Sequence, residues 1–188
     1  MYLIRGQHNL ELFKSRFKDI KLSGTIGNFD GLHLGHQAIL EKIKNNSKEF
    51  NSKTIVFFTE PHASEYFASI NNLHNEIPPR ICSWREKFKL LEKSGIDFAF
   101  FLKFNNSLRT MSPENFISEI LDSINLKSFT VGDDFRFGLD RKGDTDQLRE
   151  WGKKRGILVE NTETILYEDE RVSSSRIRKA LVDNNFKL

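Results

Sequence analysis

The sequence has 188 residues, a length that suits one domain or one domain with a small appendage. Apolar residues make up 38% and charged residues 29%, which is typical of a globular protein, and the formal net charge is +3. Lys and Arg are spread along the chain, so we expect a phosphate-rich ligand rather than a nucleic-acid partner. The single cysteine, Cys82, excludes an intrachain disulfide and a cysteine-based zinc site.

The N-terminal segment and the apolar runs bear on where the protein works. Residues 1–22 mix charged with apolar positions and contain no apolar core of the kind that a signal peptide needs. No run approaches the roughly 20 apolar residues that cross a bilayer. We therefore expect a cytoplasmic protein with no membrane partner.

Segments typical of strands and helices alternate from residue 22 onward, which predicts an α/β fold with a parallel sheet flanked by helices. The expected strands cover residues 22–26, 54–58, 97–104, 129–132, 157–160 and 164–167. The expected helices cover residues 35–50, 84–93, a segment after the N-cap Ser112, 145–155 and 173–184. Ser83 and Glu86 have the spacing of a capping box, and Gly95 and Gly156 are expected to end helices. We expect all 188 residues to form one domain.

The richest motif, Gly27–His36, lies between the first expected strand and its helix. Ligands of open parallel sheets bind where strands end and helices begin, and helix N-termini there attract phosphates. Gly27, Gly31 and Gly35 are expected to let the backbone turn and approach a ligand. His33 and His36 lie three residues apart, so both can face one object and donate hydrogen bonds to a phosphate that gains charge. Metal binding and an ordinary surface location remain alternatives for the pair.

A second motif, Arg171–Arg178, places three serines at an expected helix start. Serine hydroxyls at that position satisfy free backbone amides and can also contact a phosphate, and arginines bind phosphate oxygens in pairs. A plain N-cap on a helix with a solvated basic face explains the same residues.

A third motif, Val131–Gly138, follows the fourth expected strand. Asp133 and Asp134 can meet a ribose hydroxyl or a magnesium ion there, and Phe135 and Phe137 can flank a flat ring. Aspartates in a turn beside core phenylalanines are the alternative.

Three further features carry weaker signals. The stretch from Glu60 to Phe67 is expected to form a rigid, aromatic-rich loop at the same sheet edge, and residues 71–79 form another loop. His8 and His74 are expected at the surface. Cys82 is expected to be packed rather than reactive.

The order of these motifs resembles the adenylyltransferase module of bacterial FAD synthetase, the bifunctional riboflavin kinase/FMN adenylyltransferase family. The resemblance covers nearly the whole chain. It rests on Thr25–His36, Glu60–His62, Pro79-Arg80, Arg85–Lys87, Gly95–Asp97, Phe104-Asn105, Val131–Gly138 with Gly143, and Arg171–Arg178.

The resemblance implies a Rossmann-like nucleotidyltransferase fold and the reaction of ATP with FMN to give FAD and pyrophosphate, with Mg²⁺ accompanying ATP and no permanently bound cofactor. The implied catalytic residues are His33, His36, Arg171 and Ser174. The implied ATP-binding residues are Gly27, Asn28, Phe29, Asp30, Gly35, Gly132, Asp133, Ser173, Ser175 and Arg178. The implied FMN-binding residues are Pro61, His62, Arg80, Asn105, Asp134 and Phe137. No residue is assigned as a metal ligand.

The sequence also departs from the family pattern. Ala63 and Ser64 stand where the family often has Pro and a basic residue, and Ser175 replaces a usual Thr. The sequence contains nothing that resembles the riboflavin kinase module, so we expect no riboflavin phosphorylation by this chain. A related transferase with another acceptor, such as phosphopantetheine or nicotinate mononucleotide, is the main alternative, and a binding module without chemistry is the second. The sequence does not define an oligomeric state.

Overall fold

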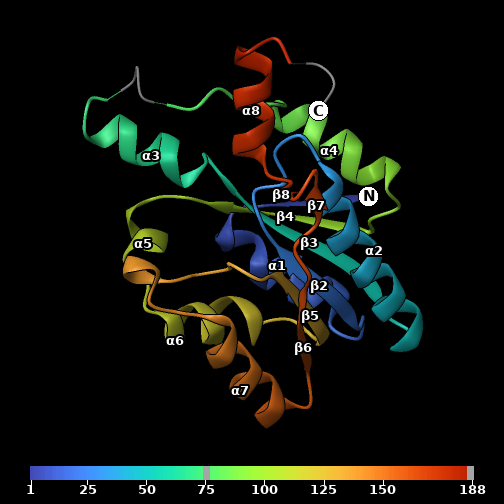
Figure 1. The fold of residues 1–188 in the computed structure, drawn as a ribbon. Helices are drawn as coiled ribbons and strands as arrows, with labels where there is room; N and C mark the ends of the chain where they lie inside the picture. Colours follow the sequence, from blue (N-terminus) through green and yellow to red (C-terminus); the bar gives the residue numbers. More distant parts are fainter. Residues whose placement is uncertain (74–76, 186–188) are drawn as a thin grey trace.

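The computed structural model describes residues 1–73 and 77–185, so the expectation for His74 lies outside the described residues. Six strands form one sheet in the order β1-β4-β3-β2-β5-β6 (Figure 1). They are β1 (Tyr2–Arg5), β2 (Leu22–Ile26), β3 (Lys53–Glu60), β4 (Phe98–Lys103), β5 (Leu126–Gly132) and β6 (Leu158–Thr162). Every neighbouring pair in this sheet is parallel, so all the strands end at one common edge. The predicted parallel α/β sheet is confirmed.

The central strands are apolar on both faces because helices cover both. In β3, Val56, Phe57 and Phe58 are 0% exposed. Since successive side chains of a strand point to opposite faces, Phe57 joins one core cluster while Val56 and Phe58 join the other. The phenylalanine runs of the sequence therefore form part of the two hydrophobic cores between the sheet and the helices on its two faces.

The helices divide between the two faces of the sheet (Figure 1). They are α1 (Leu10–Phe17), α2 (Leu34–Glu49), α3 (Ala63–Ile70), α4 (Trp84–Lys93), α5 (Asn106–Arg109), α6 (Pro113–Phe116), the π-helix η3 (Ile117–Leu121), α7 (Thr145–Arg155) and α8 (Ser174–Val182), with short 3₁₀ turns η1 (Gln7–Asn9) and η4 (Leu139–Arg141). Buried side chains of α1, α6, η3 and α7 belong to one cluster, and those of α2 and α4 belong to the other. Helices α3 and α8 lie beyond the carboxyl edge of the sheet.

Local signals in the sequence fix several helix ends. Ser83 Oγ accepts the backbone N–H of Glu86 at 3.3 Å, and Glu86 Oε2 accepts that of Ser83 at 2.8 Å, which confirms the predicted capping box. Ser112 caps α6 as expected. Gly156 ends α7 in the left-handed conformation.

One expectation was wrong, one was right only in part, and one region was not predicted. The stretch from Glu60 to Phe67 was expected to be a loop, but residues 63–70 form α3, because Glu65 accepts the backbone N–H of His62 and starts a helix there. The segment 164–167 was expected to be a short strand, but only Leu166–Tyr167 (β7) is extended, and it pairs antiparallel with Glu170–Arg171 (β8). No element was predicted before residue 22, where the structure has β1 and α1, whose apolar side chains pack beside β4.

The strand order places a topological switch point at β2, at the carboxyl edge of the sheet. From β2 the chain moves outward through β3 and β4, and then returns to β5 on the other side of β2. The loops after β2 and β5 therefore diverge, and such a switch point is where α/β sheets bind ligands.

Within residues 1–73 and 77–185, no helix combines the length and the apolar character needed to span a bilayer.

Candidate active site

The two histidines of the Gly27–His36 motif stack on each other at the start of α2. Their ring centroids lie 3.7 Å apart with an interplanar angle of 21°. His33 is the N-cap residue, and its Nδ1 accepts the backbone N–H of His36 at 3.4 Å. A neutral His33 therefore carries its proton on Nε2 and can donate it outward. The sequence correctly predicted that both imidazoles face one region.

Burial keeps this imidazole pair neutral. Burial, followed by the charges of His33 and Lys87, lowers the pKa of His36 to about 3. Burial and then the charge of Arg171 lower the pKa of His33. The Nδ1 atom of His36 is buried and, among the described residues, has no hydrogen-bond partner. The pair therefore offers neutral donors and carries unused hydrogen-bonding capacity.

The backbone of the β2–α2 loop is more strained than the glycines alone suggest. Phe29 has φ of 49°, Leu32 has φ of 45° and Gly31 has φ of 80°. We expected Gly27 and Gly35 to supply the turns, but neither has positive φ, and a phenylalanine and a leucine adopt the left-handed conformation instead. Both side chains are buried, so the hydrophobic core holds the strained loop in place.

Asp30 joins this loop to two other segments. Its carboxylate, 1% exposed, accepts the backbone N–H groups of Ile81 and Cys82 at 3.0–3.2 Å and the Arg178 guanidinium at 2.5 Å. These hydrogen bonds, led by those from Cys82 and Ile81, outweigh the effect of burial and lower the pKa of Asp30. Asp30 and Arg178, both predicted to bind ATP, thus bind each other in the free protein.

Helix α8 brings the serine motif to the same loop. Ser174 Oγ donates to the backbone carbonyl of Asp30 at 2.9 Å. Ser173 caps α8 by accepting the backbone N–H of Arg176 at 3.2 Å, as the plain capping interpretation predicts, and Ser175 is exposed. The histidine and serine motifs, far apart in sequence, therefore meet at one edge of the sheet.

Arg171 lies between the serine motif and the loop after β5. Its guanidinium forms ion pairs with Asp133 at 3.2 Å and Asp134 at 3.0 Å. All three side chains are largely exposed, and Thr164 also donates a hydrogen bond to Asp133. The ion pairs join the Val131–Gly138 motif to the Arg171–Arg178 motif. Gly132, at the end of β5, lies beside Asp134.

The residues predicted to bind FMN divide into two groups. Asn105 and Asp134 lie at accessible positions, whereas His62 and Phe137 are buried at 6% exposed each. The Phe137 ring packs against the rings of Phe116 and Phe135, with centroids 5.3 and 5.7 Å away, which supports a packing role for it.

Arg80, also in the FMN group, is bound by two carboxylates. Its guanidinium donates to Glu60 at 2.5 Å and to Glu65. These hydrogen bonds raise the pKa of Arg80 and lower that of Glu65. Arg80 therefore links α3, through Glu65, to the end of β3, through Glu60. Half-buried Pro61 lies next to Glu60 in the chain.

An aromatic cluster at the carboxyl ends of β3 and β4 was recognised from the sequence only in part. The rings of Tyr66, Phe67 and Phe104 lie 5.4–6.1 Å apart, and Phe67 is 40% exposed. The sequence indicated the first two residues, but not that Phe104 would join them from the next strand. The cluster offers apolar ring surface at the same edge of the sheet as the histidine and serine motifs.

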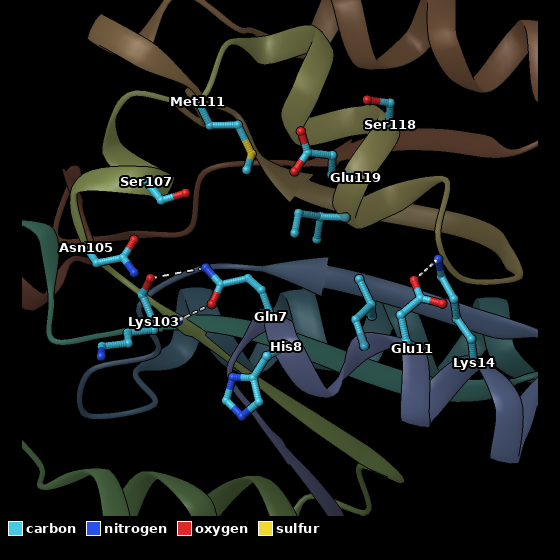
Figure 2. A pocket seen from close by; sticks show the side chains of 12 residues that line it. Gln7, His8, Glu11, Lys14, Lys103, Asn105, Ser107, Met111, Ser118 and Glu119 are labelled. Carbon is cyan, nitrogen blue, oxygen red and sulfur yellow. Dashed lines mark hydrogen bonds and ion pairs between the residues drawn. The ribbon is translucent and has the colours of Figure 1, made fainter.

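A cavity of about 680 Å³ lies between the η1–α1 segment and the connection from β4 to α5 (Figure 2). Gln7, His8, Lys103, Asn105 and Met111 are among the residues that line it. Figure 2 shows Gln7 hydrogen-bonded to the backbone of Lys103 on its floor. Asn105 is the one predicted site residue on its wall, so the cavity is separate from the histidine and serine motifs.

Metal ligands are scarce in this part of the molecule. Among residues 1–73 and 77–185, no group of three or more His, Cys, Asp or Glu side chains is arranged to hold a metal ion. A metal held by protein ligands alone, one alternative for His33 and His36, is therefore not supported by the donor set.

Comparison with known proteins identifies the family. The sequence model of FAD synthetase matches residues 17–176. The chain belongs to the FAD synthetase family. Its curated relatives include the bifunctional riboflavin kinase/FMN adenylyltransferases of Escherichia coli K12, with 36% identity over 189 residues, and of Buchnera aphidicola from Schizaphis graminum, with 37% over 190. The corresponding Haemophilus influenzae protein is 34% identical over 192 residues.

These relatives are longer than this FAD synthetase family member. Each alignment covers 100% of this chain and 58% of the relative. A solved structure described as a macrolide-efflux protein from Streptococcus pneumoniae superposes with a TM-score of 0.78, at 24% identity, over 98% of this chain and 57% of that one. That likeness concerns the fold alone. The family has the nucleotidyltransferase-like Rossmann-type fold, in agreement with the parallel sheet.

Proposed function

We propose that the chain transfers the AMP group of ATP to FMN, giving FAD and pyrophosphate. One observation carries the proposal: the stacked His33 and His36, Ser174 and Arg171 come from three segments to one edge of the sheet, at its switch point. Membership of the FAD synthetase family and the names of the relatives support the choice of reaction.

The triphosphate of ATP would lie against the N-terminus of α2. His33 Nε2 and His36 would donate to phosphate oxygens, and the free amides of the helix start would add to them. Arg171 would leave Asp133 and Asp134 to bind the same phosphates, while Ser174 would contact them from α8. The remaining proposed ATP-binding residues surround this position: Gly27, Asn28, Phe29, Asp30, Gly35, Gly132, Asp133, Ser173, Ser175 and Arg178. Of these, Phe29 and Asp30 are buried and would act by shaping the loop.

The reaction needs alignment and charge neutralisation more than it needs a base. An oxygen of the FMN phosphate, already ionised near pH 7, attacks the α-phosphorus of ATP. The bond from that phosphorus to the β-phosphate bridging oxygen breaks, and pyrophosphate leaves with the electron pair. Two anions must approach each other, so positive groups and neutral donors lower the barrier. A site that contains His, Arg and Ser but no activated nucleophile fits this chemistry.

The acceptor would lie at the carboxyl ends of β3 and β4, on one side of the switch point. Tyr66, Phe67 and Phe104 offer ring surface to which the flat isoalloxazine system can pack. Asn105 and Asp134 would make polar contacts, whereas Pro61, His62, Arg80 and Phe137 would hold the walls in shape from within the fold.

The metal would be Mg²⁺ that arrives with ATP. Mg²⁺ in such sites is held mainly by phosphates and water with one or two carboxylates, and it neutralises charge on the phosphates. Asp133 and Asp134, exposed beside Arg171, fit that donor set. The partners would then be ATP, FMN, FAD and pyrophosphate in the cytoplasm.

The direct test incubates the purified chain with Mg-ATP and one acceptor at a time. The proposal expects FAD and an equal amount of pyrophosphate with FMN, and neither product with nicotinate mononucleotide or phosphopantetheine. Pyrophosphate release with one of those acceptors and not with FMN would assign the alternative reaction. Riboflavin with ATP tests the expectation that this chain forms no FMN.

A further inference from the structure

A buried lysine in contact with His62 has no role in the chemistry described above. The side chain of Lys87, on α4, is 0% exposed. Its Nζ atom lies 3.1 Å from His62 Nε2 and 5.1 Å from the centroid of the Phe58 ring. An ammonium group has three hydrogen-bond donors, and the imidazole nitrogen accepts one of them.

Two nearby, partly buried cations each bind a carboxylate directly. Arg178 binds Asp30, and Arg80 binds Glu60 and Glu65. Among the described residues no carboxylate forms an ion pair with Lys87, and the charges of Cys82, Glu60 and Asp30 offset the effect of its burial only in part. A buried charge without a counterion is strongly unfavourable, so burial lowers the pKa of Lys87.

The charge of Lys87 acts on the phosphate-binding motif through its neighbours. It lowers the pKa of His36 and, next after burial, that of His62. Lys87 does not reach the surface, so it can act on the imidazole pair only through its charge and through His62. An anion bound at His36 would add a negative charge that favours the charged form of Lys87.

We propose that Lys87 is a positioning residue whose buried ammonium is the counter-charge for the polyphosphate bound at His33 and His36. The same ammonium holds the His62 ring in place through the Nε2 atom of His62. This inference rests on the proposed function for the identity of the anion. The charge acts through His36 and His62, so a variant that keeps the length of the side chain and removes the charge separates this role from packing.

The experiment measures the affinity for ATP by titration calorimetry, which does not depend on any acceptor. Lys87→Met is compared with the wild type and with Lys89→Met, a matched control because Lys89 is exposed on the same helix. One buried charge acting on a polyphosphate through an effective dielectric constant of about 20 is worth roughly tenfold in affinity. We expect Lys87→Met to bind ATP about tenfold more weakly and Lys89→Met to bind it as the wild type does. Equal affinity in a folded Lys87→Met protein would overturn the proposal.

The pH dependence separates charge from shape. As the pH rises from 7 through the titration of Lys87, the difference in ATP affinity between the wild type and Lys87→Met should close, because the wild type loses its charge. The other titratable or charged groups facing Lys87 are His62, Glu60, Asp30, His36, Cys82 and Arg80, and both proteins contain them. A difference that persists unchanged at high pH would assign Lys87 to packing.

A measurement on the wild type decides the matter if Lys87→Met does not fold. ATP binding is measured near pH 8.5, where ATP is fully ionised, in two buffers with different heats of ionisation. The proposal expects net proton uptake, since the bound anion favours the charged lysine. Absence of uptake would contradict it. FAD formation by the wild type reports separately on the proposed function. If the wild type forms no FAD but its ATP affinity depends on Lys87, the proposed reaction is refuted and the inference about Lys87 stands.

Discussion

The hydroxyl of Ser174 donates to the backbone carbonyl of Asp30 at 2.9 Å, across 144 residues of sequence. This hydrogen bond joins the start of α8 to the loop that holds the stacked imidazoles. Because Asp30 also binds Arg178 and the backbone of Ile81 and Cys82, one buried carboxylate organises three segments. The site therefore depends on contacts that close only when the whole fold is formed.

Replacing Ser174 by Ala should weaken both the tether and the phosphate contact. A neutral hydrogen bond contributes about 1 kcal/mol to stability, and a hydrogen bond to a charged group contributes about 1.5–3 kcal/mol. We expect a free energy of unfolding lower by about 1 kcal/mol and a kcat/KM for ATP lower by about tenfold or more. Ser15→Ala, at an exposed position of α1, is the control. Wild-type kcat/KM in the Ser174→Ala protein would show that the hydroxyl does not contact substrate.

Replacing His36 by Ala removes a hydrogen-bond donor that we propose to contact the triphosphate. Loss of one such donor should cost roughly 2–4 kcal/mol of transition-state stabilisation. Steady-state kinetics with ATP and FMN measure this as a fall in kcat, while His8→Ala, an exposed histidine elsewhere, should keep the wild-type rate. Unchanged turnover in a folded His36→Ala protein would refute the assigned role.

Protonation of His36 should make the protein sensitive to acid. The pKa of His36 is about 3 in the folded state against 6.5 for an unperturbed histidine, so between these pH values the unfolded chain binds the extra proton. Stability must therefore fall as the pH decreases through this window, by at most about 1.4 kcal/mol for each pH unit. His33 and His62, whose pKa values are also lowered, act in the same direction. Urea unfolding at several pH values should give a shallower dependence for His36→Phe than for the wild type, and equal slopes would contradict this.

Removing the carboxylate of Asp30 should destabilise the fold more than any surface change. Asp30→Ala leaves the guanidinium of Arg178 and two backbone amides without their acceptor, and breaking a buried pair costs roughly 3–5 kcal/mol. The matched control is Asp140→Ala, because the Asp140–Lys142 pair is 3.8 Å long and largely exposed. Urea unfolding measures both variants. A loss below 1 kcal/mol for Asp30→Ala would mean that the loop is held by packing alone.

Much of the architecture follows from local patterns in the sequence. The apolar runs around Phe57 and Phe100 predict buried strands, and Ser83 with Glu86 predicts a helix start, because these signals are local. The helix after Pro61 was missed because its start depends on Glu65 reaching back to the backbone of His62. The edge strand β1 was missed because its partner, β4, lies almost 100 residues away.

The site itself was only partly predictable. The spacing of His33 and His36 indicates that they share a face, but their stacking and their depth of burial come from the loop held by Phe29. The pairing of Arg171 with two aspartates and the burial of Lys87 depend on long-range contacts. Such contacts leave no local pattern in the sequence.

The most direct test of the central claim is chromatographic detection of product after the purified chain is mixed with FMN and Mg-ATP. The account predicts FAD and pyrophosphate in equal amounts, with the rate of formation of both reduced roughly thirtyfold to a thousandfold in His36→Ala. FMN and ATP that remain unchanged in the presence of the folded wild-type chain would contradict it.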